Sequence, residues 1–254
     1  MKLLNNKSGI IVGATSGIGR AAALLFAAEG ARVAIVGRRT DYLQSLSDEI
    51  AAMGGSAVAI TADITQSADI DRMIAVTLEH FSTLNFAFNN AGTIGNFVPM
   101  LDQSEDDLDK TLNTNLKSVW LSVQAQAKAM SEHGGAIVNT SSWLALGGLI
   151  GSTSYSASKA GLDGMLRPAA LELAPKNIRI NNINPGGIDT EMTREAFRHD
   201  QSTLDAFGLS HPIGRMGTSK EVAELAAFLL SDRASNITGQ AIGVDGGYAI
   251  PGQR

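Results

Sequence analysis

The 254-residue sequence predicts a doubly wound α/β fold, in which helices cover both faces of a parallel sheet of about seven strands. Short β-branched runs alternate with longer helical patterns along the chain, which is typical of strands joined by crossover helices. The strand candidates are almost uniformly apolar, as expected of a sheet covered on both faces. No internal repeat, low-complexity tract or linker interrupts the alternation, so we expect residues 1–254 to form a single domain.

The first unit of this alternation is the clearest. An Ala- and Leu-rich helical segment at 18–29 separates strand candidates at 10–12 and 32–36, and Gly30 can cap the C-terminal end of that helix. Five further strand candidates each follow a helical stretch, at 57–61, 84–89, 136–140, 178–183 and 241–244. The same βαβ arrangement is therefore predicted as far as the C-terminal strand.

Two local signals refine the predicted helices, and one segment departs from the pattern. Thr218 and Glu221 have the spacing of a capping box, which predicts a helix start. Pro168 lies inside a helical pattern, where it removes a backbone N–H and should bend the helix. Residues 186–212 are long and mixed in character, and we expect a lid or a loose excursion there, which serves as a substrate loop.

The composition excludes several classes of protein. With 44% hydrophobic and 18% charged residues, the chain resembles neither a disordered nor a membrane protein. A net charge of -5 with scattered basic residues provides no stripe for nucleic acid or anionic lipid. The sequence has no cysteine, and its histidines, at 80, 133, 199 and 211, are isolated, so we expect no disulfide and no metal site. Residues 1–9 lack the apolar core of a secretory signal, which favours a cytoplasmic location.

A glycine-rich segment, 13–19, lies where the first strand should pass into the first helix. A turn at this place directs the free N–H groups of the helix start at an anion, and Gly13, Gly17 and Gly19 allow the backbone to approach a pyrophosphate closely. The spacing is G-x-x-x-G-x-G, and an ordinary glycine-rich turn is the alternative. The position after the first strand favours a dinucleotide site.

The end of the second strand distinguishes between two dinucleotides. A fold that prefers NAD usually carries an acidic residue here for the ribose 2′-hydroxyl, whereas this chain has Gly37, Arg38 and Arg39. Guanidinium groups bind phosphate oxygens in a bidentate manner, which suits the 2′-phosphate of NADP. We therefore expect NADP(H) rather than NAD(H). Two solvated surface arginines are the alternative.

Tyr155 and Lys159 are the candidate catalytic pair. Four residues apart on a predicted helix, their side chains share one face. Ser142 follows the strand candidate at 136–140, at the sheet edge where open α/β proteins place their sites. Ser142 is therefore a candidate hydroxyl donor, with a simple turn residue as the alternative.

Taken together, these motifs resemble the short-chain dehydrogenase/reductase family in its compact single-domain form, from about Gly9 to Gly247. The motifs that carry the resemblance are the glycine turn, Asp63-Ile64, Asn89-Asn90-Ala91-Gly92, Asn115, Ser142, Tyr155 with Lys159, Pro185-Gly186, Thr190 and Val244-Asp245-Gly246-Gly247. Two of these residues have a structural alternative. Asn115 also suits the interior of a helix, where it would bond to its own backbone, and Asp63 also suits a helix cap.

The resemblance implies a Rossmann-like fold and a catalytic tetrad. Tyr155 would be the general acid/base, Ser142 would orient the substrate oxygen, Lys159 would support Tyr155, and Asn115 would anchor a proton relay. Asp63 would face the adenine. The implied cofactor contacts are Gly13, Thr15, Ser16, Gly17, Ile18, Gly19, Arg38, Arg39, Asp63, Ile64, Asn90, Ala91, Gly92, Tyr155, Lys159, Pro185, Gly186, Ile188 and Thr190. A homotetramer is also implied.

The chemistry of a phenol sets conditions on such a site. A free tyrosine has a pKa near 10, so acid/base work near neutrality needs a drop of about three units, or ~4 kcal/mol of preferential phenolate stabilisation. An exposed Tyr–Lys pair is worth only ~0 to 1 kcal/mol. We therefore expect a partly dry site that also holds the positive charge of an oxidised nicotinamide.

The substrate end of the site is less defined. Apolar side chains near the candidate residues form either the wall of an apolar pocket beside Ser142 or local loop cores. They are Phe97, Trp143, Met192, Phe197, Phe207 and Leu209. The first reading favours a hydrophobic ketone or secondary alcohol. We therefore expect an NADP(H)-dependent oxidoreductase for such substrates. A 3-oxoacyl-thioester (acyl-carrier-protein) reductase and a non-catalytic dinucleotide-binding sensor or scaffold are the alternatives.

Overall fold

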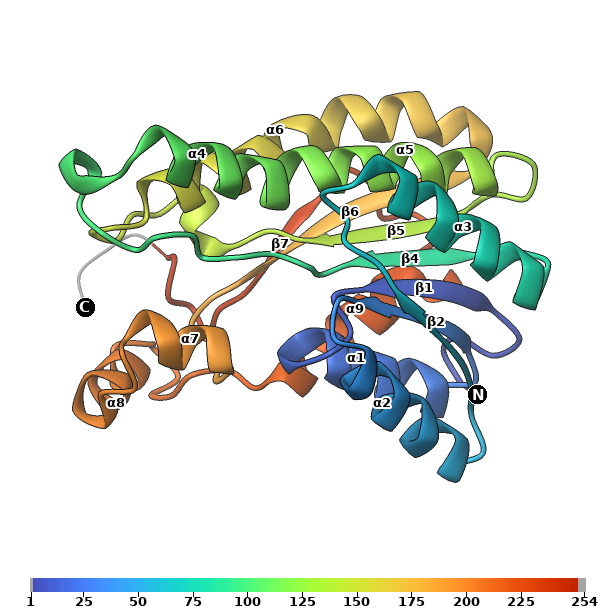
Figure 1. Ribbon diagram of the computed structural model, residues 1–254, viewed down its shortest axis with the longest axis horizontal. Helices are drawn as coiled ribbons and strands as arrows, with labels where there is room; N and C mark the ends of the chain where they lie inside the picture. Colours follow the sequence, from blue (N-terminus) through green and yellow to red (C-terminus); the bar gives the residue numbers. More distant parts are fainter. Residues whose placement is uncertain (1, 251–254) are drawn as a thin grey trace.

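A computed structural model describes residues 2–250, and its centre is one parallel sheet of seven strands (Figure 1). The strands are β1 (Ser8–Val12), β2 (Arg32–Gly37), β3 (Ser56–Thr61), β4 (Phe86–Asn89), β5 (Gly135–Thr140), β6 (Ile178–Pro185) and β7 (Ala241–Val244). They lie in the order β3-β2-β1-β4-β5-β6-β7. The strand order reverses between β1 and β4, which creates a crevice at the carboxyl ends of these strands. The predicted doubly wound fold is confirmed.

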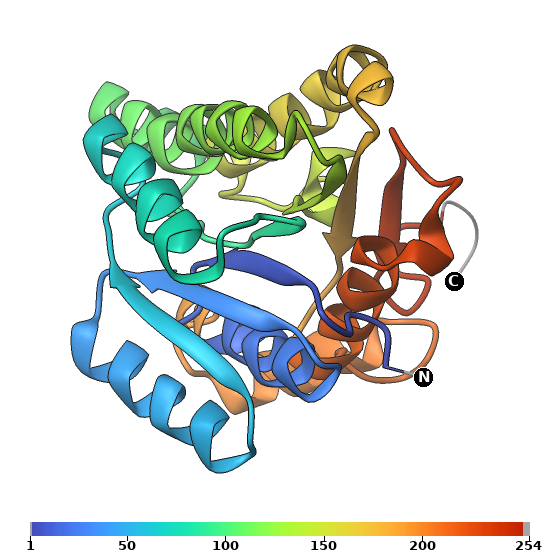
Figure 2. The same cartoon turned by 90° about the vertical axis from the view of Figure 1, so that its right-hand side faces the viewer.

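Helices cover both faces of the sheet (Figures 1 and 2). The helices α1 (Gly17–Ala28), α2 (Thr40–Ala52) and α9 (Ser219–Leu230) lie on one face. The other face carries α3 (Ser67–Phe81), α4 (Glu105–Leu112), α5 (Ser118–Met130) and α6 (Thr153–Leu173). The strands β1, β2, β4, β5 and β6 are therefore mostly buried, which explains their largely apolar sequences, whereas the edge strands β3 and β7 are partly exposed.

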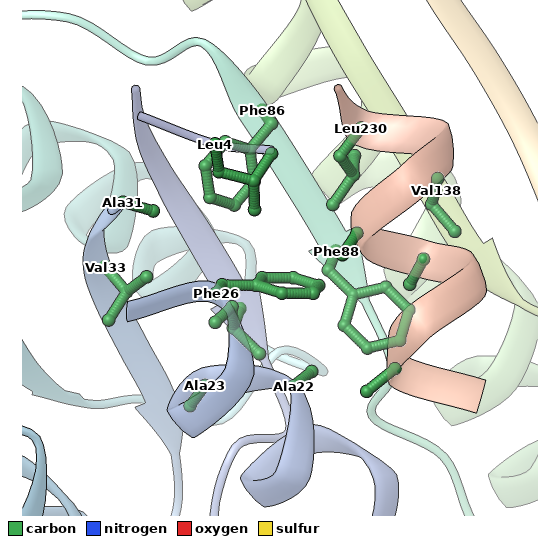
Figure 3. Packing of buried hydrophobic residues seen from close by; sticks show 14 of the residues in the cluster. Leu4, Ala22, Ala23, Phe26, Ala31, Val33, Phe86, Phe88, Val138 and Leu230 are labelled. Carbon is green, nitrogen blue, oxygen red and sulfur yellow. The ribbon is translucent and has the colours of Figure 1, made fainter. Parts of the chain in front are cut away.

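The core beneath α1 and α9 fixes the strands that lead to the crevice. Phe26 of α1 packs edge-on against Phe86 of β4, with 5.7 Å between ring centroids, and lies 5.9 Å from Phe88 (Figure 3). All three rings are fully buried, and burial of each stabilises the fold by roughly 1.5 to 3 kcal/mol. This packing holds α1 against β4 and thus sets the spacing of the loops at their ends.

Local sequence signals set the helix ends as predicted. Gly30 has φ +88°, the left-handed conformation that ends α1, and the N–H of Ala31 donates to the carbonyl of Phe26. At the start of α9, Thr218 and Glu221 form both hydrogen bonds of a capping box. Both predictions are confirmed.

Two segments differ in detail from their sequence patterns. Pro168 lies within α6, which continues to Leu173, so the helix passes through the proline, and the expected bend stays a prediction. The segment 186–212 contains two helices, α7 (Glu191–Ala196) and α8 (Gln201–Leu209), which stand apart from the sheet in Figure 1. Within residues 2–250, no helix combines the length and apolar character that crossing a membrane requires.

Candidate functional site

A cavity of about 380 Å³ opens at the carboxyl ends of the central strands. It brings together most of the site residues that the sequence predicts. Those in its lining are Gly13, Thr15, Ser16, Gly17, Ile18, Arg38, Arg39, Asp63, Ile64, Asn90, Ala91, Gly92, Ser142, Tyr155, Lys159, Pro185, Gly186, Ile188, Thr190 and Met192. Those outside its lining are Gly19, Asn115, Phe97, Trp143, Phe197, Phe207 and Leu209.

The glycine turn between β1 and α1 requires its glycines. Gly13 has φ +84°, and a Cβ there would lie 2.6 Å from the backbone nitrogen of Ala91. A Cβ at Gly19 would lie 2.0 Å from the carbonyl oxygen of Gly13. The turn therefore packs directly against the loop after β4, where the Asn90 amide donates to the Gly13 carbonyl over 3.3 Å.

The N-terminus of α1 fits a pyrophosphate. Its N-cap residue is Ser16, whose side chain makes no capping hydrogen bond. Among the described residues, no side chain accepts a hydrogen bond from the first-turn N–H groups of α1, and Gly17 and Ile18 of this turn line the cavity. The tight glycine turn and these N–H groups together form a cradle that suits the phosphates of a dinucleotide.

Two exposed arginines, Arg38 and Arg39, lie at the end of β2, and Asp41 follows them in the first turn of α2. Arg39 donates to the hydroxyls of Thr15 and Ser16 at 2.7 and 2.9 Å, and its guanidinium lies 4.3 Å from the ring centroid of Tyr42. Among residues 2–250, neither Arg38 nor Arg39 forms an ion pair with a carboxylate. Neither guanidinium is thus neutralised by an ion pair within the described residues.

Asp63 lies in the turn after β3 and does not cap α3, whose N-cap is Gln66. The Asp63 carboxylate accepts hydrogen bonds from the backbone and the hydroxyl of Thr65, at 3.0 and 2.9 Å. Asp63 therefore stabilises a local turn and is not the helix cap that was its alternative. It also lines the cavity.

Lys159 and Tyr155 lie one turn apart on α6. Lys159 is 3% exposed, and its Nζ donates to the Thr140 carbonyl over 2.7 Å. The Nζ lies 5.6 Å from the centroid of the Tyr155 ring. Burial lowers the pKa of Lys159 to about 8, and the nearby Asp163 carboxylate opposes this change. Lys159 is therefore desolvated, as the phenol chemistry requires, whereas Tyr155 is half-buried.

Burial also governs the phenol itself. It raises the pKa of Tyr155, and a hydrogen bond with the Ser142 side chain opposes the rise. This direction is opposite to the drop that a general base needs near neutral pH. The chain's own groups therefore keep the phenol protonated at neutral pH, in the form that donates a proton.

Ser142 is the N-cap of a short 3₁₀ segment, Trp143–Ala145, that follows β5. Its hydroxyl accepts from the backbone N–H of Leu144 over 3.1 Å, and its carbonyl accepts from the Asn184 amide over 3.1 Å. Both contacts fix the main chain beside the hydroxyl. Ser142 is thus a turn residue and also a fixed hydroxyl next to Tyr155.

Asn115 is fully buried in a π-helical turn, Asn113–Lys117, between α4 and α5. Its side chain accepts from the N–H of Thr93 and donates to the carbonyl of Thr93, both over 2.8 Å. It also donates to the Ser158 hydroxyl over 3.1 Å. The alternative in which Asn115 bonds its own backbone is wrong, because these bonds tie the loop after β4 to α6.

The aromatic side chains assigned to a substrate pocket lie mostly in a cluster of their own. Phe207 lies 4.9 Å from Phe197 and 5.5 Å from Tyr248, and Tyr248 lies 4.7 Å from Trp143, between ring centroids. His211, 2% exposed, stacks on Tyr248 at 4.5 Å. We call these five residues the aromatic cluster. This arrangement corresponds to the alternative of a local core for Trp143, Phe197 and Phe207.

The remaining residues of that assignment separate into two groups. Met192 lines the cavity and is 37% exposed, so it lies where a substrate can reach it. Phe97 lies beside Gly151, where a Cβ would come within 3.1 Å of its ring, and Leu209 is 73% exposed. No group of three or more potential metal-ligating side chains occurs among residues 2–250.

Sequence reasoning missed two polar residues beside the catalytic candidates. Asp163 follows Lys159 by four residues on α6, and Asn184 precedes Pro185 at the end of β6. The Asn184 amide donates to the Asp163 carboxylate over 2.8 Å and to the Ser142 carbonyl. The spacing of Asp163 from Lys159 was a signal available in the sequence. The place of Asn184 depends on the fold.

Comparisons with known proteins agree with this geometry. A family model described as enoyl-(acyl carrier protein) reductase matches residues 13–249. A cyclohexanol dehydrogenase of Acinetobacter sp. (strain SE19) is 39% identical over 245 residues, which cover 96% of this chain and 95% of the relative. A 3-oxoacyl-[acyl-carrier-protein] reductase, FabG, of Thermotoga maritima is 38% identical over 249 residues, which cover 97% and 99%.

Solved structures are similar over the same length. A short-chain type dehydrogenase/reductase from Mycobacterium marinum has a TM-score of 0.91 and 35% identity, covering 98% of this chain and 97% of that one. A 7α-hydroxysteroid dehydrogenase, complexed with NADH and 7-oxo glycochenodeoxycholic acid, has a TM-score of 0.90 and 33% identity, covering 96% and 94%. The similarity in sequence and in structure therefore extends over nearly the whole chain.

Proposed function

Because the chain belongs to the short-chain dehydrogenase/reductase family, whose members are oxidoreductases of alcohols and carbonyls that use a nicotinamide dinucleotide, we propose that it interconverts a ketone and a secondary alcohol with NADP(H). The observation that carries this proposal is a single cavity lined by the glycine turn, by two unpaired arginines and by Ser142, Tyr155 and Lys159.

The preference for NADP(H) rests on charge. Arg38 and Arg39 are exposed, lie in the lining of the cavity and have no carboxylate partner among the described residues. A 2′-phosphate would supply the missing negative charge, and the hydroxyls of Thr15 and Ser16 would add hydrogen bonds beside it. A carboxylate that would repel this phosphate, and bind the 2′-hydroxyl of NAD, is absent from the end of β2. NAD(H) is the alternative cofactor.

The residues of the chain have separate roles in the proposed reaction. When bound, the dinucleotide supplies a hydride to the carbonyl carbon or accepts one from the alcohol carbon. Tyr155 donates its phenolic proton to the carbonyl oxygen, and Ser142 donates a hydrogen bond to the same oxygen as its negative charge grows. The Lys159 ammonium stabilises the phenolate that remains. Asn115 fixes the loop after β4, through Thr93, next to this group.

The phenol must regain its acidity from a source beyond Lys159. Burial raises the pKa of Tyr155, and Lys159, with a pKa of about 8, is only partly charged above that pH. Ketone reduction starts from the protonated phenol, the form that the chain itself favours. Alcohol oxidation starts from the phenolate, which needs additional positive charge in the cavity.

A hydrophobic ketone or secondary alcohol is the proposed substrate class. Ile188 and Met192 are apolar side chains of the substrate loop that line the cavity, and Met192 is 37% exposed. The cyclohexanol dehydrogenase among the relatives acts on a substrate of this kind by its name. The similarly close FabG relative favours a second candidate, a 3-oxoacyl-thioester reductase.

A homo-oligomer, with four chains as the family resemblance implies, is also part of the proposal. Trp120 of α5 and Leu171 of α6 are large apolar side chains on the outer helices, 57% and 78% exposed. Such residues favour contact with another chain. Sedimentation analysis of the wild type and of Trp120→Glu tests this: the wild type should sediment as a tetramer and the variant as a smaller species.

The proposed activity is tested by cofactor oxidation with a panel of substrates. Cyclic and aromatic ketones and an acetoacetyl thioester are offered separately with NADPH and with NADH, and absorbance of the reduced cofactor is followed. We expect the fastest oxidation of NADPH with a hydrophobic ketone. Faster turnover of the thioester would favour the second candidate, and faster turnover with NADH would contradict the cofactor proposal.

A further inference from the structure

A chain of hydrogen-bonded polar side chains crosses the sheet inside the protein and ends at Ser142. Asn89 and Gln126 exchange two hydrogen bonds of 2.9 and 2.7 Å, and Asn89 also donates to Asn139 over 2.9 Å. Asn139 in turn donates to Asn182 over 3.0 Å. These three asparagines are paired neighbours on β4, β5 and β6, and all are buried. We call this row, with Asp163 and Asn184, the amide chain.

Asp163 connects the amide chain to α6. One of its carboxylate oxygens accepts from the Asn182 amide and the other from the Asn184 amide, each over 2.8 Å. Because Asp163 follows Tyr155 by eight residues and Lys159 by four, all three side chains lie on one face of α6. The carboxylate thus ties the face of α6 that carries the catalytic candidates to β6.

Asn184 carries the connection to Ser142. Its Nδ2 lies between two acceptors, the Asp163 carboxylate and the Ser142 carbonyl, which fixes the orientation of the amide. Its Oδ1 is buried and has no hydrogen-bond partner within residues 2–250. A buried acceptor without a partner destabilises a protein, so this placement indicates that the two donated bonds serve another need.

We propose that Asp163 and Asn184 are positioning residues for the proton transfer: Asp163 holds the Lys159 turn of α6 on β6, and Asn184 links the same carboxylate to the main chain of Ser142. The inference rests on the proposed function of Tyr155, Ser142 and Lys159. It accounts for how the Ser142 hydroxyl, after β5, and the Lys159 ammonium, on α6, are held in position relative to each other although they lie on separate elements.

The surroundings of Lys159 make Asp163 its dominant charged neighbour. On its own helix Lys159 faces Tyr155 and Asp163, and the Asp163 carboxylate raises the pKa that burial lowers. From β5 comes the neutral Thr140 carbonyl. β6 presents the neutral amides of Asn182 and Asn184 toward Asp163, and the loop after β4 places the neutral backbone of Gly92 near the ammonium. In the described residues, no second carboxylate is recorded as acting on Lys159.

The test compares Asp163→Asn with Glu172→Gln, a matched neutralisation at an exposed position farther along α6. The pKa of Lys159 is measured by NMR titration of its ε-carbon, assigned with Lys159→Arg, and kcat and KM for ketone reduction are measured across pH. Loss of the carboxylate makes the ammonium easier to deprotonate. We therefore expect the Lys159 midpoint of Asp163→Asn to fall below that of the wild type by about one pH unit.

The pH dependence of the kinetics should shift in the same direction as the Lys159 midpoint. In Asp163→Asn, the alkaline decline of kcat/KM should move to lower pH, and kcat should fall by about tenfold to a hundredfold with little change in KM for NADPH. Removing a negative charge makes both Tyr155 and Lys159 more acidic, so the direction holds for a coupled pair. Glu172→Gln should match the wild type in all three measurements.

Asn184→Ala separates positioning from charge and also covers the case in which Asp163→Asn fails to fold. It keeps the carboxylate but removes the donor to Ser142, so kcat should fall by about tenfold while the Lys159 midpoint stays at the wild-type pH. Thermal unfolding and NADPH binding confirm that each variant is folded. A merely structural role of Asn184 would lower stability without lowering kcat in the folded Asn184→Ala variant.

The outcomes for the inference and for the proposed function are distinguishable. Folded Asp163→Asn and Asn184→Ala variants with wild-type kcat, pH profile and Lys159 midpoint would overturn the inference. If the wild type oxidises no NADPH with any ketone, the proposed function fails. The NMR titration needs no turnover, so in that case an unchanged Lys159 midpoint in Asp163→Asn still overturns the inference and a lowered one still supports it.

Discussion

The two ends of the cavity differ in the chemical groups that form them. At the end near β1 and β2, glycine backbone and two exposed arginines line the cavity, and Arg39 contacts the nearby side chains of Thr15, Ser16 and Tyr42. At the end near β5 and β6, buried side chains bond to one another and to main-chain carbonyls. The first end therefore depends on local shape and charge, whereas the second depends on contacts between distant segments.

This difference predicts how substitutions behave. At the dinucleotide end, each exposed arginine would contribute one contact to the phosphate, so single changes should have moderate effects. At the catalytic end, each group depends on its neighbours, so single changes should have large effects that do not add.

The largest effect is expected from Lys159→Met. We expect turnover to fall by at least about a thousandfold, because the phenolate loses its cation. The folded-state pKa of Lys159, about 8, is below its ordinary value of 10.5, so the unfolded chain binds the extra proton more tightly between these values. Wild-type stability should therefore rise with pH across that window, and below it the buried charge destabilises the fold.

Removing that charge should stabilise the protein at neutral pH. The pKa difference corresponds to about 3 kcal/mol, and loss of the bond to Thr140 offsets about 1 kcal/mol. Urea unfolding at neutral pH should thus show Lys159→Met to be more stable by about 2 kcal/mol, with the gain shrinking toward about pH 10. Lys128→Met, on the exposed face of α5, is the control. A variant less stable than the wild type at neutral pH contradicts this account of burial.

Gly13→Ala tests whether close approach shapes the dinucleotide end. A methyl group would meet the backbone of Ala91, so we expect at least about tenfold weaker NADPH binding and a loss of stability of about 2 kcal/mol. Gly54→Ala is the matched control, because Gly54 has φ +76° but open space around its Cβ position. Equal NADPH binding by both variants, measured by fluorescence titration, would show that positive φ alone matters.

Arg38→Ala and Arg39→Ala should lower the preference for NADPH over NADH. Loss of one charge-assisted phosphate contact corresponds to about a tenfold to hundredfold drop in the ratio of the two kcat/KM values. Because the two adjacent arginines would contact the same phosphate, the double variant should lower the ratio further than either single variant, by an amount that differs from the sum of the two free-energy changes. Arg167→Ala, on the exposed side of α6, should leave the ratio unchanged. An unaltered ratio in the double variant would remove the basis for the NADP proposal.

The smallest effect is expected from Tyr42→Ala. The Tyr42 ring supports the Arg39 guanidinium at 4.3 Å and is 57% exposed, so its loss should raise KM for NADPH by about twofold to fivefold. Tyr42→Phe keeps the ring face and should match the wild type. If Tyr42→Phe and Tyr42→Ala raise KM equally, the hydroxyl rather than the ring is responsible.

The same contrast explains what the sequence could predict. Gly13, Gly17, Arg38 and the Tyr155–Lys159 pair act through short spacings within one turn or one helix, and such patterns are visible in the sequence. The strands were predicted to within three residues at each end because burial on both faces makes them apolar.

Contacts between distant segments left no comparable pattern. Asp163 and Asn184 are 21 residues apart and meet only because α6 packs on β6, so neither was identified. Phe197 and Phe207 were assigned to a pocket because they are apolar, but composition does not specify whether a side chain in a substrate loop faces the cavity or its own neighbours.

Tyr155→Phe provides the most direct test of the proposed proton transfer. The variant lacks only the phenolic oxygen, so it should bind NADPH as tightly as the wild type and reduce ketones at least about a thousandfold more slowly. Ketone-dependent NADPH oxidation, with binding checked by fluorescence, gives the comparison in one assay. Turnover within about tenfold of the wild type would contradict the role of Tyr155 and, with it, the reaction proposed for the cavity.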